Sequence, residues 1–263
     1  MCALELGCSL LRFLGLKGTS ALTKLILHLN IENNWKCVVW VLIFRNMFNY
    51  PVPQVSIKRF FMCSNYSEWD EYYRKYPLEE LGWELGKPRP ILIEYVEKGI
   101  IPKGRALDIC CGAGTNTVYL AQSGFDVTGI DISTTAIEIA KKKAKKAKVN
   151  INFLAESFID LPFKDEEFDF VFDMGCFHHV EVEDRTMFIA GVHRVLKKGG
   201  VYMLTCFSYR NGSGWNHFTR QQIVALFSGL FELGEFRHYP SLEGDGYIRF
   251  FYTVLMKKKP QPT

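Results

Sequence analysis

Two acidic side chains and a glycine-containing turn are the parts of this sequence best suited to binding a nucleotide-like ligand. Asp108 lies in an apolar segment that runs directly into the turn Cys110-Cys111-Gly112-Ala113-Gly114. Because glycine has no Cβ, Gly112 and Gly114 allow a ligand to approach the backbone closely. Asp131 ends the next apolar segment, 23 residues after Asp108, where a carboxylate can accept hydrogen bonds from both hydroxyls of a ribose. The alternative, that Asp131 only caps the helix after it, does not account for the turn and the acid occurring together.

Titratable side chains follow a later apolar segment, which ends in Asp173 and is succeeded by His178 and His179. Side chains at this end of a strand meet ligands in open α/β sheets. Histidine titrates near neutral pH and a carboxylate can also take a proton, so these three are the candidate catalytic bases. For each histidine the alternative is a hydrogen-bonded spacer or a surface residue. The eight cysteines include no CxxC pair, so we expect free thiols and no metal site.

These side chains must be positioned by a parallel sheet, because strand and helix patterns alternate from Arg105 onward. The expected strands are Ala106–Ile109, Asp126–Ile130, Asn152–Leu154, Phe168–Asp173, Val201–Phe207, Phe231–His238 and Tyr247–Met256. The expected helices are Asn116–Gln122, Thr134–Lys146, Asp184–Leu196 and Thr219–Phe227. Gly199 and Gly200 are expected to end the third of these helices. The pattern predicts an α/β fold with a mostly parallel sheet of about seven strands, helices on both faces and a C-terminal antiparallel hairpin.

At these residues the chain resembles the class I S-adenosylmethionine-dependent methyltransferases, from about Trp69 to Lys259. Phe153-Leu154-Ala155-Glu156-Ser157 and Arg194-Val195-Leu196-Lys197-Lys198-Gly199-Gly200 match further family segments in the right order. The resemblance implies a Rossmann-like methyltransferase fold and S-adenosylmethionine as cofactor, with the glycine turn holding its amino-acid end and the second acid its ribose. The cofactor contacts that the resemblance implies are Trp83, Asp108, Cys110, Gly112, Gly114, Asp131, Ile132, Glu156, Ser157 and Asp173.

The sequence departs from the family at two of these positions. Cys110 stands where the family usually has glycine, and Glu156 stands where it usually has aspartate. Cysteine is small, so we expect close approach to survive if φ at Cys110 is negative. Glutamate is one methylene longer than aspartate, which changes the geometry of the contact with the adenine amino group that the resemblance implies.

A narrower resemblance concerns Trp69 and the segment Trp83-Glu84-Leu85-Gly86-Lys87-Pro88-Arg89-Pro90. They are similar to the lid of the thiopurine, thiol/halide and tellurite-resistance methyltransferases. The segment after the fourth strand of those enzymes is in turn similar to Asp173-Met174-Gly175-Cys176-Phe177. This implies a small, soft acceptor such as a thiol, halide or metalloid, which needs no general base. The alternatives are a small hydroxyl or amine acceptor that uses a His or Asp base, and, for Trp83, a core position under a helix.

Two other classes of protein share parts of this pattern. A nicotinamide-dependent oxidoreductase would carry a third glycine three residues after Gly114, which this chain lacks. A methyltransferase-like module that binds the cofactor without catalysis remains an alternative, although the intact acids and glycines of the turn count against it. We therefore expect a methyltransferase.

Charge is distributed unevenly along the chain. Residues 1–62 carry seven Lys/Arg and two Asp/Glu, a balance of +5, whereas residues 63–263 carry 25 and 26, a balance of −1. A near-neutral domain argues against a nucleic-acid partner. No apolar run reaches the roughly 18 residues of a membrane span. We expect residues 1–62 to be a leader extension of which residues 1–60 are dispensable, with a transit-like or membrane-surface segment as the alternative. Residues 63–263 are expected to be the methyltransferase domain, and the protein to be a cytoplasmic monomer.

Overall fold

The computed structural model describes residues 68–260, so the expected leader, residues 1–62, lies outside the described residues. A seven-stranded sheet has the order β3-β2-β1-β4-β5-β7-β6. The strands are β1 (Arg105–Ile109), β2 (Asp126–Asp131), β3 (Asn152–Ala155), β4 (Phe168–Met174), β5 (Leu196–Phe207), β6 (Phe231–Leu242) and β7 (Ile248–Lys258). The first five run parallel and β7 is antiparallel to both β5 and β6, which confirms the predicted sheet and its hairpin.

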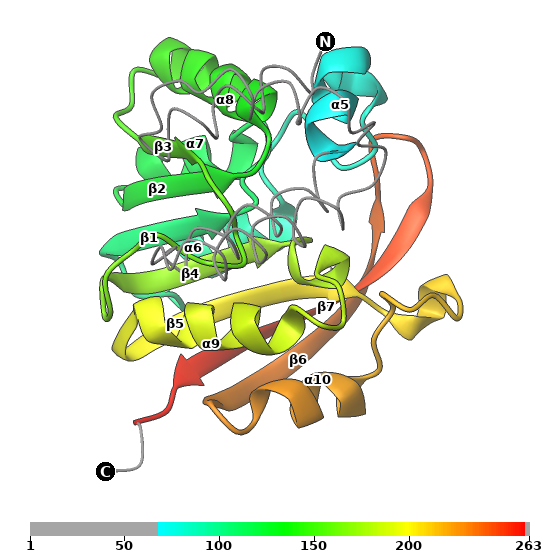
Figure 1. Ribbon diagram of the computed structural model, residues 1–263. Helices are drawn as coiled ribbons and strands as arrows, with labels where there is room; N and C mark the ends of the chain where they lie inside the picture. The colour runs from blue at the N-terminus through cyan, green and yellow to red at the C-terminus, as the bar shows by residue number, and fades with distance from the viewer. Residues whose placement is uncertain (1–67, 261–263) are drawn as a thin grey trace, which may run out of the picture. The chain divides into compact units, whose positions relative to one another are not determined.

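Helices lie on both faces of this sheet, as predicted (Figure 1). They are α5 (Glu68–Lys75), α6 (Pro90–Glu97), α7 (Thr115–Gln122), α8 (Thr134–Ala147), α9 (Arg185–Val195) and α10 (Arg220–Phe227), with short 3-10 helices η1 (Leu78–Glu80), η2 (Phe177–His179) and η3 (Tyr209–Asn211). None of these helices is both long and apolar enough to cross a membrane.

Alternation along the central strands builds two cores, because successive strand side chains point to opposite faces. Leu107 and Val171 pack with α9 and α10 on one face. Ala106 and Phe170 pack with α6 and α7 on the other. The fully buried central strands therefore read as continuous apolar runs, as expected for a sheet covered on both sides.

Two predicted boundaries are wrong: β6 continues to Leu242 instead of ending at His238, and the boundary between the third predicted helix and the fifth strand is displaced. Helix α9 ends at Val195 and strand β5 begins at Leu196, so Gly199 and Gly200 lie inside the strand instead of ending the helix. The pairing of β4 with β5 is irregular near Phe168, and a Cβ on Gly200 would lie 2.9 Å from the carbonyl oxygen of Lys197. The second glycine is thus needed for a close backbone approach within an irregular strand.

The sheet brings the candidate residues to one edge. Parallel strands β1, β2, β4 and β5 have their carboxyl ends on the same side, and antiparallel β7 begins there. The tip of the β6–β7 hairpin rises toward α5 at this edge (Figure 1). All the candidate residues from the sequence that follow a strand end are therefore neighbours in space.

Candidate functional site

Asp108 lies beneath the glycine turn. Its side chain is buried and accepts a 2.6 Å hydrogen bond from the hydroxyl of Thr117 in α7. The pKa of Asp108 is raised to about 7, chiefly by burial. The Thr117 hydrogen bond opposes this rise, and the nearby carboxylates of Asp131 and Asp173 add to it. The geometry therefore makes Asp108 a positioning residue that fastens the turn to α7.

Each of the two glycines of the turn leaves room for a different neighbouring residue. Both have positive φ, +54° at Gly112 and +76° at Gly114, which glycine adopts without strain. A Cβ on Gly114 would lie 2.7 Å from the Cβ of Ala140, so this glycine permits α7 to pack against α8. A Cβ on Gly112 would lie 2.5 Å from the hydroxyl of Tyr73, so this glycine faces the segment before β1.

Asp131 is held at the end of β2 by backbone donors. One carboxylate oxygen accepts from the Ser133 N–H at 2.9 Å and the other from the Gly112 N–H at 2.8 Å. Burial raises the pKa of Asp131 to about 6 against the lowering effect of these N–H groups. A carboxylate has about four lone-pair sites, so acceptor capacity is left on both oxygens. Asp131 thus both orders the turn and can still accept a ligand's hydroxyls.

The third predicted acid stands beside Asp131. The Glu156 N–H donates to the Asp131 carbonyl at 3.0 Å, which joins the ends of β3 and β2. The hydroxyl of Ser157 is buried and accepts from the Ile159 N–H at 3.2 Å, so it shapes the loop after Glu156. Ile132, half-buried, packs against the main core. The structure therefore brings these predicted residues together at one edge.

Cys110 differs from its predicted state in two ways. Its φ is +54°, in the left-handed region, instead of the negative value that close approach required. Its sulfur forms a disulfide with Cys176, so the expectation of free thiols is wrong for this pair. The cause is topology: β1 and β4 are neighbours, with Ile109 opposite Asp173, although the two cysteines are 66 residues apart. Cys111 and Cys206 are free and buried, and burial raises the pKa of both thiols.

Asp173 is fully buried and its oxygens are occupied by the protein. They accept from the Cys176 N–H at 2.8 Å, from the Phe177 N–H at 3.2 Å and from the Tyr202 hydroxyl at 2.8 Å. Burial raises the pKa of Asp173 to about 7, opposed by these hydrogen bonds. This geometry gives Asp173 a positioning role: it holds the start of η2, the turn that carries both histidines.

The two histidines are neutral and packed among rings. His178 is buried, accepts at Nδ1 from the Phe207 N–H at 3.1 Å and stacks on the Phe207 ring with centroids 3.7 Å apart. His179 meets the edge of Trp69 at 4.7 Å. Burial lowers the pKa of His178 well below its usual value and that of His179 to about 4. Neither side chain is a strong base at neutral pH.

A continuous line of rings runs across this edge of the sheet, which we call the ring line. Its successive members have centroids 3.7 to 5.6 Å apart: Trp83, Trp69, His179, His178, Phe207 and His217. Sequence reasoning identified three of its six members as site candidates. Phe207 and His217 were not among these candidates, because nothing in their spacing reveals the stacking.

The segment 68–90 covers the glycine turn, and we call it the lid. Trp83 is 38% exposed, so it is not a core residue, and its Nε1–H donates to the Tyr73 hydroxyl at 2.9 Å. Glu84 accepts from the Ala113 N–H at 3.2 Å and from the Thr115 hydroxyl at 3.3 Å. Tyr73 and Glu84 were missed as site residues; the only sequence signal was that Glu84 adjoins Trp83.

The lid also contacts the turn of the β6–β7 hairpin, whose two strands come last in the order of the sheet. Buried Arg89 pairs with buried Glu243 at 2.7 Å and donates to the Trp83 carbonyl at 3.0 Å. The Gly244 N–H donates to the Gly82 carbonyl at 2.7 Å. The hairpin turn therefore braces the lid over the strand ends.

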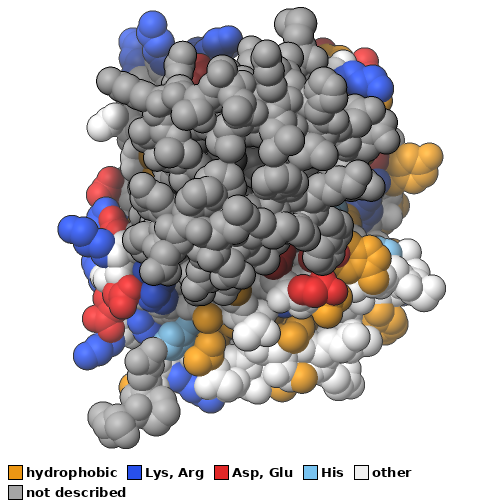
Figure 2. Space-filling view, in the orientation of Figure 1, with side chains coloured by type: hydrophobic (Ala, Val, Ile, Leu, Met, Phe, Trp, Pro, Cys, Tyr) orange, Lys and Arg blue, Asp and Glu red, His pale blue; other side chains and the backbone are white. Residues whose placement is uncertain are grey.

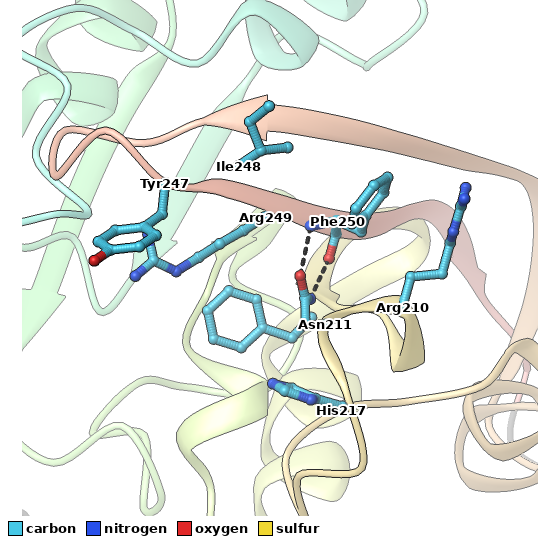
Figure 3. Close-up of a pocket in the computed structure, with 8 residues that line it drawn as sticks. Arg210, Asn211, His217, Tyr247, Ile248, Arg249 and Phe250 are labelled. Atoms are coloured by element: carbon cyan, nitrogen blue, oxygen red, sulfur yellow. Dashed lines mark hydrogen bonds between the residues drawn. The ribbon is translucent and has the colours of Figure 1, made fainter.

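A cavity of about 390 Å³ opens beyond Phe207, between η3 and the start of β7 (Figure 3). Its lining residues are Phe207, Arg210, Asn211, His217, Tyr247, Ile248, Arg249 and Phe250. We call it the β7 pocket. Phe207 belongs both to the ring line and to this pocket, so the two adjoin each other.

Charge is divided between the two sides of the site. Three acids, Glu84, Asp108 and Asp131, surround the glycine turn, with the cation Lys143 3.6 Å from Glu84, whereas Arg210 and Arg249 line the β7 pocket. On the face drawn in Figure 2, the coloured acidic and basic side chains are interspersed along the left edge. Acidic and basic side chains are therefore separated at the site, whereas along this visible edge of the surface they are mixed.

A family model described as a methyltransferase domain matches residues 106–200. The chain is 41% identical over 133 residues to an uncharacterized methyltransferase of Synechocystis, covering 51% of this chain and 58% of that protein. It is 37% identical over 135 residues to a probable thiol methyltransferase of Arabidopsis thaliana, covering 50% and 59%. The chain thus spans less than two thirds of the length of these relatives.

This chain covers a larger share of the length of two further proteins. An uncharacterized methyltransferase of Schizosaccharomyces pombe is 35% identical over 120 residues, covering 46% of this chain and 83% of that protein. The crystal structure of an S-adenosylmethionine-dependent methyltransferase from Methanosarcina mazei is 26% identical with a TM-score of 0.56, covering 65% of this chain and 98% of that one. Sequence and fold therefore agree on one group of proteins.

Proposed function

Because the chain belongs to the class I S-adenosylmethionine-dependent methyltransferases, we propose that it transfers the methyl group of this cofactor to a small, soft nucleophile, a thiol above all. The observation that carries the choice of acceptor is that none of the three predicted bases, Asp173, His178 and His179, is an available strong base in the described structure. Asp173 is buried with its oxygens occupied, and burial lowers the pKa of both His178 and His179. A thiolate needs no such base.

The glycine-turn side of the site fits S-adenosylmethionine. The cofactor carries a sulfonium, an ammonium and one carboxylate, a net positive charge, and it would meet Glu84 and Asp131 at the turn. Asp131 has acceptor capacity for two ribose hydroxyls, and Glu156 beside it would face the adenine end. When bound, the cofactor supplies an electrophilic methyl group: the acceptor's lone pair forms the new bond to carbon, and the broken carbon–sulfur pair returns to the cofactor's sulfur.

Alanine at Asp131 should weaken S-adenosylmethionine binding by about 1–3 kcal/mol, roughly 5- to 150-fold, because two ribose hydroxyls lose their acceptor. Calorimetric titration measures this directly. The matched control is Asp126→Ala at the other end of β2, whose side chain is 80% exposed, and it should leave the affinity unchanged. Unchanged affinity in a folded Asp131→Ala protein would contradict the proposal that Asp131 binds the ribose.

The chemistry of the ring line favours a soft acceptor. A hydroxyl must lose a proton to a base, and an imidazole whose conjugate acid has a pKa of about 4, as His179 has, is too weak for this at neutral pH. A thiol ionises by itself near neutral pH, and its polarizable sulfur packs well against aromatic rings. The protein then contributes position and exclusion of water, which the lid provides.

The resemblance to a probable thiol methyltransferase supports the same proposal. That name belongs to the Arabidopsis protein, and the match covers about three fifths of its length. The lid residues Trp69 and Trp83, which resemble those of thiol and halide methyltransferases, stand at one end of the ring line here. A closed, ring-lined site is suited to small molecules, since a lid over the strand ends excludes macromolecules.

The pH profile should distinguish a thiol acceptor from a hydroxyl acceptor. With a small thiol, the rate should rise with pH as the acceptor's own thiolate forms, and His178→Gln or His179→Gln should change kcat less than about threefold. The measurement is kcat/KM against pH for a thiol and for a phenol of similar shape. If the phenol alone is methylated, and a His→Gln change lowers that rate by roughly 10²-fold or more, the acceptor requires a base and the proposal is wrong.

A further inference from the structure

We propose that the β7 pocket binds an anionic group carried by a planar methyl acceptor, and that Arg210 recognises this group. The inference rests on the proposed function, because it names a second feature of the same acceptor. A ligand whose sulfur lies against the partly buried ring of His179 can direct its remaining body toward Phe207, whose ring centroid is 6.2 Å from that of His179. The ring of His217 lies 5.6 Å beyond Phe207, at the wall of the pocket.

Tertiary structure places the pocket's residues there through strand pairing. Phe207 at the end of β5 lies opposite Phe251 in β7, so the preceding residues of β7 extend past the end of β5. The Asn211 side chain fixes this arrangement by accepting from the Phe250 N–H and donating to the Phe250 carbonyl, both at 2.7 Å (Figure 3). Both amide atoms of Asn211 are thus occupied, so Asn211 is a brace and not a ligand contact.

Arg210 is the cation of the pocket that the protein leaves available. Its exposed guanidinium lies over the Phe250 ring at 4.6 Å, and within residues 68–260 it forms no ion pair. The other cation, Arg249, is bound by both oxygens of Asp245 at 2.6 and 2.7 Å. Arginine presents a planar fork of donors that matches a carboxylate, so Arg210 is suited to reading an anionic group.

The walls of the pocket match a planar body. Phe207 and Phe250 provide ring faces, while Tyr247 and Ile248 stand 69% and 63% exposed at its edge. Exposed apolar side chains grouped around a cavity mark a binding site more often than scattered ones do. The His217 Nδ1 lies 3.1 Å from the Gly212 carbonyl oxygen and 3.3 Å from the Gly214 nitrogen, and these contacts set the orientation of its ring at the wall of the pocket.

The charges at the glycine turn and at the β7 pocket are opposite to those of the cationic methyl donor and of the anionic acceptor, respectively. Acids surround the turn where the cationic methyl donor would bind, and the unpaired guanidinium of Arg210 lies on the acceptor side. An anion on the acceptor is therefore drawn toward the pocket and away from the acidic turn. This orientation would place the opposite end of the acceptor, which carries the nucleophile, toward the ring line.

Binding tests the pocket without turnover. We would titrate 4-(methylthio)benzoate and its neutral analogue thioanisole, which cannot be methylated at a free thiol, into protein saturated with S-adenosylhomocysteine. The carboxylate should bind the wild type at least tenfold more tightly than thioanisole, and Arg210→Gln should remove that preference. The matched control is Arg220→Gln, since Arg220 also lies over a ring, that of Phe236, but does not line the pocket. Equal carboxylate affinity in the wild type and Arg210→Gln would overturn the proposal.

Turnover then separates this proposal from the function on which it rests. With 4-mercaptobenzoate and thiophenol, at a pH where both are ionised, Arg210→Gln should raise KM about tenfold for the carboxylate alone and leave kcat within twofold. If the wild type methylates neither thiol but still binds the carboxylate through Arg210, the pocket stands and the thiol acceptor fails. If both thiols are methylated with KM values that Arg210→Gln leaves unchanged, the anion pocket fails and the function stands.

Discussion

Replacing Arg89 by methionine should lower the free energy of unfolding of the domain by about 3–5 kcal/mol, because it leaves the Glu243 carboxylate buried without its cation. The side chains of this pair are 8% and 3% exposed, and their nitrogen and oxygen are 2.7 Å apart. The change also removes the bond from Arg89 to the Trp83 carbonyl, which braces the lid. Cofactor affinity should therefore fall together with stability. Denaturant unfolding and calorimetry measure the two effects.

A matched control is Arg237→Met, because Arg237 pairs with Glu94 at 3.2 Å but both side chains are partly exposed. An exposed pair contributes about 0–1 kcal/mol, so this variant should unfold almost like the wild type. The double variant Arg89→Met, Glu243→Met removes both members of the buried pair and should recover much of the lost stability. A loss no larger for Arg89→Met than for Arg237→Met would show that the lid is not held through this pair.

Reduction of the Cys110–Cys176 disulfide should lower the melting temperature by roughly 8–16 °C. The bond closes a loop of 66 residues, and cross-linking a loop of that length stabilises a fold by about 4 kcal/mol in the chain-entropy account. For a domain of this size each kcal/mol corresponds to about 2–4 °C. Thermal melts with and without a thiol reductant make the comparison.

The control for this experiment is Cys176→Ala, in which reductant should no longer change the melting temperature. The variant keeps the other cysteines of the chain, so a reductant effect that persists in it would come from them and not from this bond. Alkylation under denaturing, non-reducing conditions gives a second test, because a disulfide protects both sulfurs even when the chain is unfolded. Labelling of Cys110 and Cys176 in the unreduced, denatured protein would contradict the bond.

The alternation of strands and helices could be predicted because it depends on local periodicity. The apolar runs of β1 and β4 and the amphipathic pattern of α8 each lie within a short window of sequence. The glycine turn and Asp131 were likewise recognisable, since each follows a strand end directly. The wrong boundary at Gly199 and Gly200 arose because a strand irregularity uses glycine for the same backbone reasons as a helix end.

The chemistry of the site depended on contacts between distant parts of the chain. Arg89 and Glu243 are 154 residues apart, and Cys110 and Cys176 are 66 apart, so no local pattern relates them. Burial decided the roles of the titratable groups: Asp173 became a brace for η2, and His179 became a weak base with a pKa of about 4. Residue type and spacing alone determined which elements form and where a nucleotide-like ligand would bind. Packing at the strand ends decided which side chains are charged, which are occupied and which can reach an acceptor, because desolvation and pairing exist only in the folded chain.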